Sequence, residues 1–208
     1  NFQKAINLYE KTIQLNPNFS LPYYNLGLIF HELQEYQKAI NSFKKAIEIK
    51  PDYAEAYSNL GIIFKELGNF EQAINCFKST IKYKPDDLIT LHYLYDLNKE
   101  VLSPDLETKI IKIINNKNCT KLNLAYGNFL LSIYELQRKN YKSEFNYFIK
   151  GHNHYFESEK NNFNSIIEYW SKVVPEVKKL VISNKSDIEI EKVSYDIKPI
   201  FIIGVPRC

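Results

Sequence analysis

Residues 20–51 read SLPYYNLGLIFHELQEYQKAINSFKKAIEIKP, and residues 54–85 repeat that pattern as AEAYSNLGIIFKELGNFEQAINCFKSTIKYKP. The two stretches align at an offset of 34 residues, a period typical of stacked helical repeats. Residues 1–17 align with the second half of the unit. The positions that agree in both full copies include Tyr23 and Tyr57, Asn25 to Gly27 and Asn59 to Gly61, Phe30 and Phe64, Ala39-Ile40 and Ala73-Ile74, Phe43 and Phe77, and Pro51 and Pro85. This periodicity predicts an array of similar units.

Each unit is predicted to form two helices, because its apolar residues recur at helical spacing and a proline closes the second helix. The expected helices cover residues 1–15, 20–33, 37–49, 54–67 and 71–83. We expect Gly27, Gly61, Ala39 and Ala73 to be small because two helix backbones approach each other there. Each helix pair leaves an apolar face that only the next pair can cover, so the units should stack.

After Pro85 the repeat weakens, but the pattern stays helical. Ser103 and Pro104 are typical of a helix start, with serine as the N-cap and proline in the first turn. Further helices are expected over residues 88–102, 104–115, 121–138, 141–158, 166–173 and 176–182. In the last long pair, Gly127 is expected to replace the small residue, and Tyr141, Phe145 and Phe148 the aromatic ones.

The pattern through Pro85 resembles the tetratricopeptide repeat, and the expected fold class is therefore all-α, a helix-turn-helix solenoid with a C-terminal helical cap. The resemblance implies that the first helices line a concave groove that binds a protein or an extended peptide. Beyond the two full units, His92 and Tyr93 stand at positions equivalent to the groove residues of the units. The groove residues that it implies are Asn25, Leu28, His31 and Glu32 in one unit, and Asn59, Ile62, Lys65 and Glu66 in the next.

The composition limits the functions that are expected besides peptide binding. A net charge of +3, with both signs interspersed, favours neither nucleic acid nor an anionic membrane as a partner. Cys76, Cys119 and Cys208 form no disulfide or metal pattern, which favours a reducing, cytoplasmic location. We expect Cys76 to be a packing residue. The four histidines show no zinc spacing and are expected at the surface, and no set of catalytic residues is identified.

Residues 199–208, PIFIIGVPRC, contain the one motif in this sequence that indicates a particular binding chemistry. Residues 200–203 are typical of a buried parallel strand, Gly204 allows a tight turn, and Arg207 places a cation where an anion would bind. An ordinary strand and turn remains an alternative. A second alternative is the start of a nucleotide-binding P-loop, G-x-x-x-x-G-K-[ST].

The same ten residues resemble the start of the sulfotransferase loop G-x-P-R-S-G-T-T. The resemblance implies that Gly204, Pro206, Arg207 and Cys208 bind the co-substrate 3′-phosphoadenosine-5′-phosphosulfate, with Cys208 replacing the usual serine. In similar bacterial proteins, tetratricopeptide units precede such a domain. We therefore expect the chain to stop at the start of a truncated α/β domain, and to be catalytically incomplete by itself.

Four segments are expected: a repeat array over 1–102, a degenerate repeat and cap over 103–182, a linker over 183–198, and the first strand and loop of the sulfotransferase over 199–208. The predicted function is a protein- or peptide-binding array that recruits a substrate or partner for the sulfotransferase. The alternatives are a non-catalytic scaffold, the repeat region of a glycosyltransferase, and a P-loop nucleotide enzyme.

Overall fold

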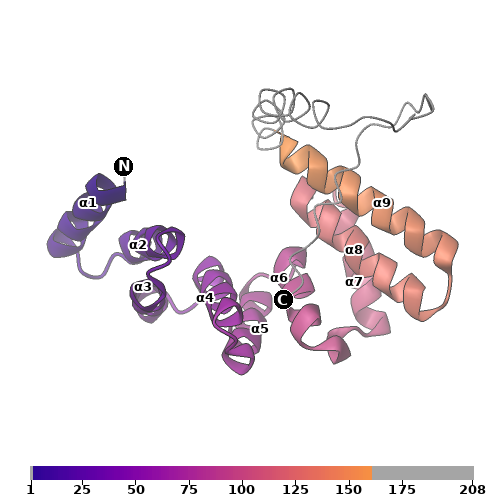
Figure 1. Ribbon diagram of the computed structural model, residues 1–208, viewed down its shortest axis with the longest axis horizontal. Helices are drawn as coiled ribbons and strands as arrows, with labels where there is room; N and C mark the ends of the chain where they lie inside the picture. The colour runs from indigo at the N-terminus through magenta and orange to yellow at the C-terminus, as the bar shows by residue number, and fades with distance from the viewer. Residues whose placement is uncertain (1, 161–208) are drawn as a thin grey trace, which may run out of the picture. The chain divides into compact units, whose positions relative to one another are not determined.

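The computed structural model describes residues 2–160, which form helices and no strand (Figure 1). They lie within one compact unit, Asn1–Lys160. The helices expected over 166–173 and 176–182, the linker and the strand all lie outside the described residues. The described helices are α1 (Phe2–Leu15), α2 (Ser20–Glu32), α3 (Tyr36–Ile49), α4 (Ala54–Glu66), α5 (Phe70–Tyr83), α6 (Leu88–Leu97), the 3-10 helix η1 (Lys99–Val101), α7 (Pro104–Ile114), α8 (Lys121–Gln137) and α9 (Tyr141–Ser158).

The helices pair in the way that the repeat predicts. Helices α2 and α3 form one hairpin, α4 and α5 the next, and α8 and α9 a third (Figure 1). Neighbouring pairs are joined because α1 packs on α2, α3 on α4, and α5 on α6, while α2 also contacts α4. The expected all-α solenoid of stacked helix-turn-helix units is confirmed, and most helix ends fall within one residue of the prediction.

One helix is shorter than expected. The sequence predicts a helix over 88–102, but α6 ends at Leu97 and a 3-10 turn follows. Asn98 interrupts the helix with an extended backbone, and its side-chain oxygen accepts a hydrogen bond from the Glu100 amide at 3.1 Å. A short polar side chain that bonds to nearby backbone competes with helix continuation, which explains the early end.

The repeated aromatic residues form the core of the array. Phe43 and Phe77 are fully buried, and each ring lies against the glycine of the preceding helix. A methyl group at Gly27 would come within 2.6 Å of the Phe43 ring, and one at Gly61 within 2.5 Å of the Phe77 ring. At these two glycines, the missing side chain makes room for the ring of the partner helix.

The last helix pair inverts this arrangement. In α9, Phe148 stands where the buried Phe43 and Phe77 stand in the array, but it is 46% exposed, and Phe145 is 63% exposed. Tyr141, which is 63% exposed, resembles Phe70 at the start of α5, which is 54% exposed. Leu88 and Ile114 fill the space beside Gly127, so no ring from α9 can enter it. The glycine that receives a ring is Gly151 of α9, which Phe129 of α8 contacts.

The turns inside the three hairpins share a left-handed residue. Gln34, Gly68 and Lys139 have φ values of 59°, 75° and 59°. Each follows the C-cap of the first helix, where a left-handed residue commonly ends a helix. Only one of the three is a glycine, although side chains disfavour this conformation.

Candidate functional site

The residues expected to line the groove lie on α2 and α4, two first helices that contact each other. None of them is fully buried, as a binding surface requires. Leu28, Glu32 and Glu66 are exposed, and the side chain of Leu28 keeps 37% of its surface. The half-buried members are Asn25, His31, Asn59, Ile62 and Lys65.

A hydrogen bond joins two of these residues across the repeats. His31 Nε2 lies 2.9 Å from Glu66 Oε2, so the α2 side chain reaches the end of α4. The His31 side chain is 25% exposed, so it lies partly covered at the surface. Its imidazole thus links α2 to the last residue of α4.

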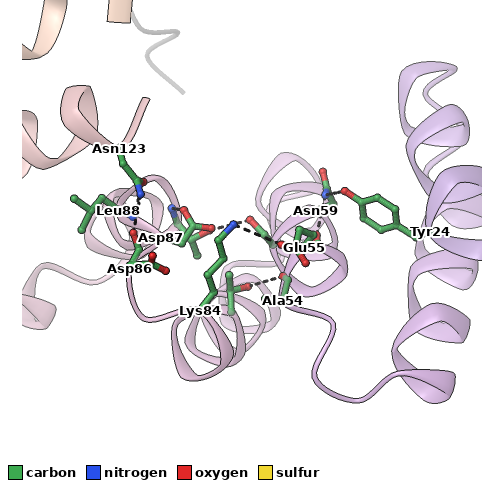
Figure 2. Close-up of polar contacts among 12 residues, drawn as sticks. Tyr24, Ala54, Glu55, Asn59, Lys84, Asp86, Asp87, Leu88 and Asn123 are labelled. Carbon is green, nitrogen blue, oxygen red and sulfur yellow. Dashed lines mark hydrogen bonds and ion pairs between the residues drawn. The ribbon is translucent and has the colours of Figure 1, made fainter. Parts of the chain in front are cut away.

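Asn59 is held by two partners (Figure 2). Its Nδ2 donates to the Glu55 carbonyl of the same helix at 2.8 Å and to the Tyr24 hydroxyl of α2 at 3.3 Å. The Tyr24 ring stacks on Tyr53 at a centroid distance of 4.9 Å, which fixes the position of the hydroxyl. Burial and the nearby Glu55 raise the pKa of Tyr24. The repeat pattern does not reveal Tyr24, because the equivalent position in the next unit is Ser58.

Asn25 occupies the equivalent position one repeat earlier but is not held in this way. Its side chain makes no hydrogen bond with any residue of the described segment 2–160. A free amide offers a donor and an acceptor to a ligand. Asn25, without a side-chain hydrogen bond in residues 2–160, and the neighbouring exposed Leu28 therefore form the part of this face that is most available to a ligand.

The face continues onto α6. Lys65 Nζ lies 4.5 Å from the centroid of the Tyr93 ring, a cation–π distance. Tyr93 meets the Tyr126 ring of α8 edge to face at 6.2 Å. Lys65 is therefore positioned by an aromatic residue of the following repeat.

His92 lies on α6 where this helix contacts α8. Its side chain is 21% exposed and packs edge to face against Tyr126 and Phe129 of α8. Its buried Nδ1 forms no hydrogen bond, although Asp96 Oδ2 lies at an ion-pair distance of 3.5 Å. Burial lowers the pKa of His92, with Asp96 acting in the opposite direction. The apolar surroundings therefore favour a neutral imidazole.

A further polar contact, which the sequence analysis missed, joins α8 to the start of α6 (Figure 2). Asn123 Nδ2 donates to the Asp86 carbonyl at 2.9 Å, and its Oδ1 accepts from the Leu88 amide at 3.1 Å. Asp87 caps the same helix end by accepting from the Thr90 amide at 3.2 Å. Asparagine is so abundant in this chain that nothing in the sequence distinguishes Asn123 from its neighbours.

The described residues contain no obvious chemical centre. Within 2–160 no three His, Cys, Asp or Glu residues gather in a way that could hold a metal ion. Cys76 and Cys119 are free thiols, and Cys76 is buried as the packing residue that was expected. None of the helices in this range combines the length and apolar character needed to cross a membrane. Gly204, Pro206, Arg207 and Cys208 lie outside the described residues.

Comparison with known proteins supports the repeat assignment. A family model described as tetratricopeptide repeat matches residues 8–41, a second matches residues 54–87, and a model described as TPR repeat matches residues 27–68. The comparison with curated proteins returns no match.

Solved structures match over a larger part of the chain. The crystal structure of MamA is 20% identical with a TM-score of 0.54, over 76% of this chain and 91% of that chain. A double mutant named MamA RS-1 ArsTM is 16% identical with a TM-score of 0.54, over 76% of this chain and 88% of that one. At this identity the likeness shows the fold alone. Together, the family matches and the helix pairs show that residues 8–87 of this chain form tetratricopeptide repeats.

Proposed function

We propose that the face formed by α2, α4 and α6 is a groove that binds an extended segment of a protein or peptide. Tetratricopeptide repeats are typically protein-binding modules, and this chain contains them. The observation that carries the proposal is the contrast along the face. Asn25 has an uncommitted amide beside the exposed Leu28, whereas Asn59 and Lys65 are held in place by Tyr24 and Tyr93. A surface with side chains already held loses less entropy when it binds.

Peptide selection tests this proposal. Random displayed peptides are selected on the 208-residue chain, and the affinity of selected peptides is measured by titration calorimetry. Asn25→Ala combined with Leu28→Ala is expected to weaken binding about tenfold, the loss expected for one hydrogen bond and part of an apolar contact. Lys78→Ala is the matched control, because Lys78 is exposed on the second helix α5. Equal affinity for all three proteins would contradict a groove on this face.

We also propose that the complete protein is a sulfotransferase that uses 3′-phosphoadenosine-5′-phosphosulfate, and that the array recruits its substrate or partner. The support is the sequence of residues 199–208, in which Arg207 and the loop amides suit a phosphate. A cytoplasmic location belongs to this proposal, since Cys76 and Cys119 are unpaired.

Calorimetric titration of the full-length protein with this co-substrate, or with its desulfated product, tests the enzyme proposal. Binding that Arg207→Ala weakens at least tenfold is expected, because the substitution removes a charge-assisted contact. Absence of binding would favour the non-catalytic scaffold. Gly-Lys-Ser or Gly-Lys-Thr after Cys208 would instead indicate a P-loop enzyme.

A further inference from the structure

Helix α9 carries an apolar stripe on one exposed side. The residues of the stripe are Tyr141, Phe145, Phe148, Ile149 and His152. With about 3.6 residues per turn, these positions fall within about 100° of the helix circumference, so their side chains leave the helix on one side. Tyr141 and Phe145 are each 63% exposed, Phe148 is 46% exposed and Ile149 is 36% exposed. The stripe therefore forms one apolar surface rather than a set of scattered residues.

The regular repeats cover the residues that are equivalent to this stripe. Phe145 corresponds to Ile40 of α3, which is 6% exposed, and Phe148 corresponds to the fully buried Phe43. Helix α3 is followed by α4, which packs on it, and α5 is followed by α6 in the same way. Among residues 2–160 no helix follows α9. The stripe is thus left open in the described part of the chain.

No charged side chain interrupts the stripe. Outside its arc lie the charged residues of α9, which are Lys142, Glu144, Lys150 and Glu157. The rings of Phe129 and Phe148 lie 5.0 Å and 4.4 Å from the His152 imidazole, and burial lowers the pKa of His152, which favours the neutral ring at pH 7. An uncharged surface can lose its water at low cost, as the core of an interface requires.

The area of the stripe is sufficient for a dimer of modest stability. An aromatic side chain has roughly 200 Å² to bury, so the exposed parts of the three rings and Ile149 amount to roughly 400 Å². Two copies would bury roughly 800 Å² of apolar surface. Because about two thirds of a homodimer interface is apolar, the whole interface would bury roughly 1,200 Å². This area is the lower limit for a stable, specific interface.

The order of residues along the stripe allows it to pair with itself. Its centre lies between Phe148 and Ile149. Phe145 and His152 lie equally far from this centre, on opposite sides of it. When two such helices pack antiparallel about a two-fold axis at the centre, Phe145 of each copy faces His152 of the other. We propose that two copies of this chain associate through this stripe, with their α9 helices antiparallel.

Sedimentation velocity of the 208-residue chain tests the association. We expect the sedimentation coefficient to rise with concentration between about 1 and 100 μM, because an interface of this size supports weak binding. Phe145→Lys should weaken the association at least tenfold, since it places two uncompensated charges in the interface. Phe70→Lys is the matched control, because Phe70 is 54% exposed but lies on α5.

A cysteine placed near the expected two-fold axis tests the antiparallel arrangement. In a chain with Cys119→Ser and Cys208→Ser, Ile149→Cys should form a disulfide-linked dimer under mild oxidation, because the two copies of position 149 lie beside each other. Tyr141→Cys is the control. Its two copies would lie about 22 Å apart along the helix axis, too far for a disulfide. Equal crosslinking of the two variants, or crosslinking of neither, would contradict this arrangement.

A chain that stays monomeric at all these concentrations would overturn the inference, and so would an association that Phe145→Lys leaves unchanged. If the chain is monomeric, a loss of unfolding stability in Phe145→Lys would show that the same chain covers the stripe. Unchanged stability would leave the stripe to a different protein. None of these results bears on the proposed peptide site, because that site lies on α2, α4 and α6.

Discussion

Asparagine side chains differ greatly in how much of this fold depends on them. Asn25 makes no side-chain hydrogen bond in the described part of the chain, whereas Asn123 connects α8 to both Asp86 and Leu88 at the start of α6. Leu88 is fully buried, so replacing Asn123 would remove a hydrogen-bond partner from the Leu88 amide where little water can take its place. The composition conceals this difference, because it depends on what lies opposite each side chain.

We predict that Asn123→Ala lowers the free energy of unfolding by about 1 kcal/mol, because the Asp86 carbonyl and the Leu88 amide lose their hydrogen bonds to α8 and keep only the 3.1 Å bond between them. Asn123→Asp should cost less, since it keeps an acceptor for the Leu88 amide. Urea unfolding followed by circular dichroism measures both effects. The control is Asn75→Ala, at an exposed position of α5 whose side chain forms no described hydrogen bond. A loss as large for Asn75→Ala as for Asn123→Ala would contradict the assignment.

His92 makes stability sensitive to acid. Burial lowers its pKa below the ordinary value of 6.5, so the folded state prefers the neutral ring. The stabilisation is present above about pH 6.5, where the unfolded imidazole is neutral too, and it is lost as the pH falls through the lower folded pKa. We predict that acidification from about pH 7 to pH 5 destabilises the wild type more than His92→Gln.

Unfolding midpoints in urea at both pH values check this prediction, and titration of the imidazole by NMR gives the pKa itself. The groups around His92 include Asp96, which opposes the shift, and Lys65 and Lys99, which reinforce it. A folded pKa at or above 6.5 would show that Asp96 outweighs burial.

At the scale of the element, the helices of the array and those of the C-terminal part begin differently. No side chain caps the N-terminus of α2, α3, α4 or α5. By contrast, α6, α7, α8 and α9 are capped by Asp87, Ser103, Thr120 and Asn140. The regular repeats thus rely on packing between helices, whereas the degenerate ones add local hydrogen bonds at their ends.

We predict that Ser103→Ala costs about 1 kcal/mol of unfolding free energy, the usual value of an N-cap. The Ser103 hydroxyl accepts from the Leu106 amide at 3.3 Å, and alanine cannot replace this bond. Ser103→Asp should retain stability, since aspartate also caps helices and favours the positive end of the helix dipole. Thermal unfolding compares the two. Equal losses for alanine and aspartate would show that the hydroxyl does not act as the cap.

The helices themselves were predictable because their signals are local. The Ser103-Pro104 start, the proline ends and the aromatic spacing place most boundaries within one residue. The inverted contact between α8 and α9 was not predictable. Whether Gly127 receives a ring depends on Leu88 and Ile114, which come from two other helices. For the candidate site, the sequence predicted the two helices that carry the proposed groove residues, but not the restraint of Asn59 by Tyr24.

At the scale of the whole molecule, the core of the described residues consists of two apolar clusters. One cluster is centred on Phe43 and Phe77 of the array, and the other on Ile110 and Leu130 of the C-terminal helices. Helix α6 belongs to both, because Leu94 lies in the first and Leu91 in the second. Because consecutive units mainly contact their neighbours, we expect the two clusters to open separately, as is usual in repeat proteins.

We predict that Leu130→Ala, which removes a fully buried side chain from the second cluster, costs about 2–5 kcal/mol. Hydrogen exchange should accelerate strongly in α7 and α8 and much less in α2 and α3, because the lost contacts are local. Phe43→Ala, the matched substitution in the first cluster, should produce the reverse pattern. Uniform acceleration along residues 2–160 in both variants would indicate a single cooperative unit.

The left-handed turns have a consequence for how such an array diverges. Gln34 and Lys139 adopt nearly the same backbone conformation as Gly68, although a side chain there costs about 1 kcal/mol or more. Packing between the two helices of a hairpin therefore imposes the turn, and the turn residue only makes it easier or harder to reach. A mutational drift that replaces the turn glycine lowers stability without changing the hairpin. Copies of the unit can thus lose sequence similarity in their turns long before they lose their common shape.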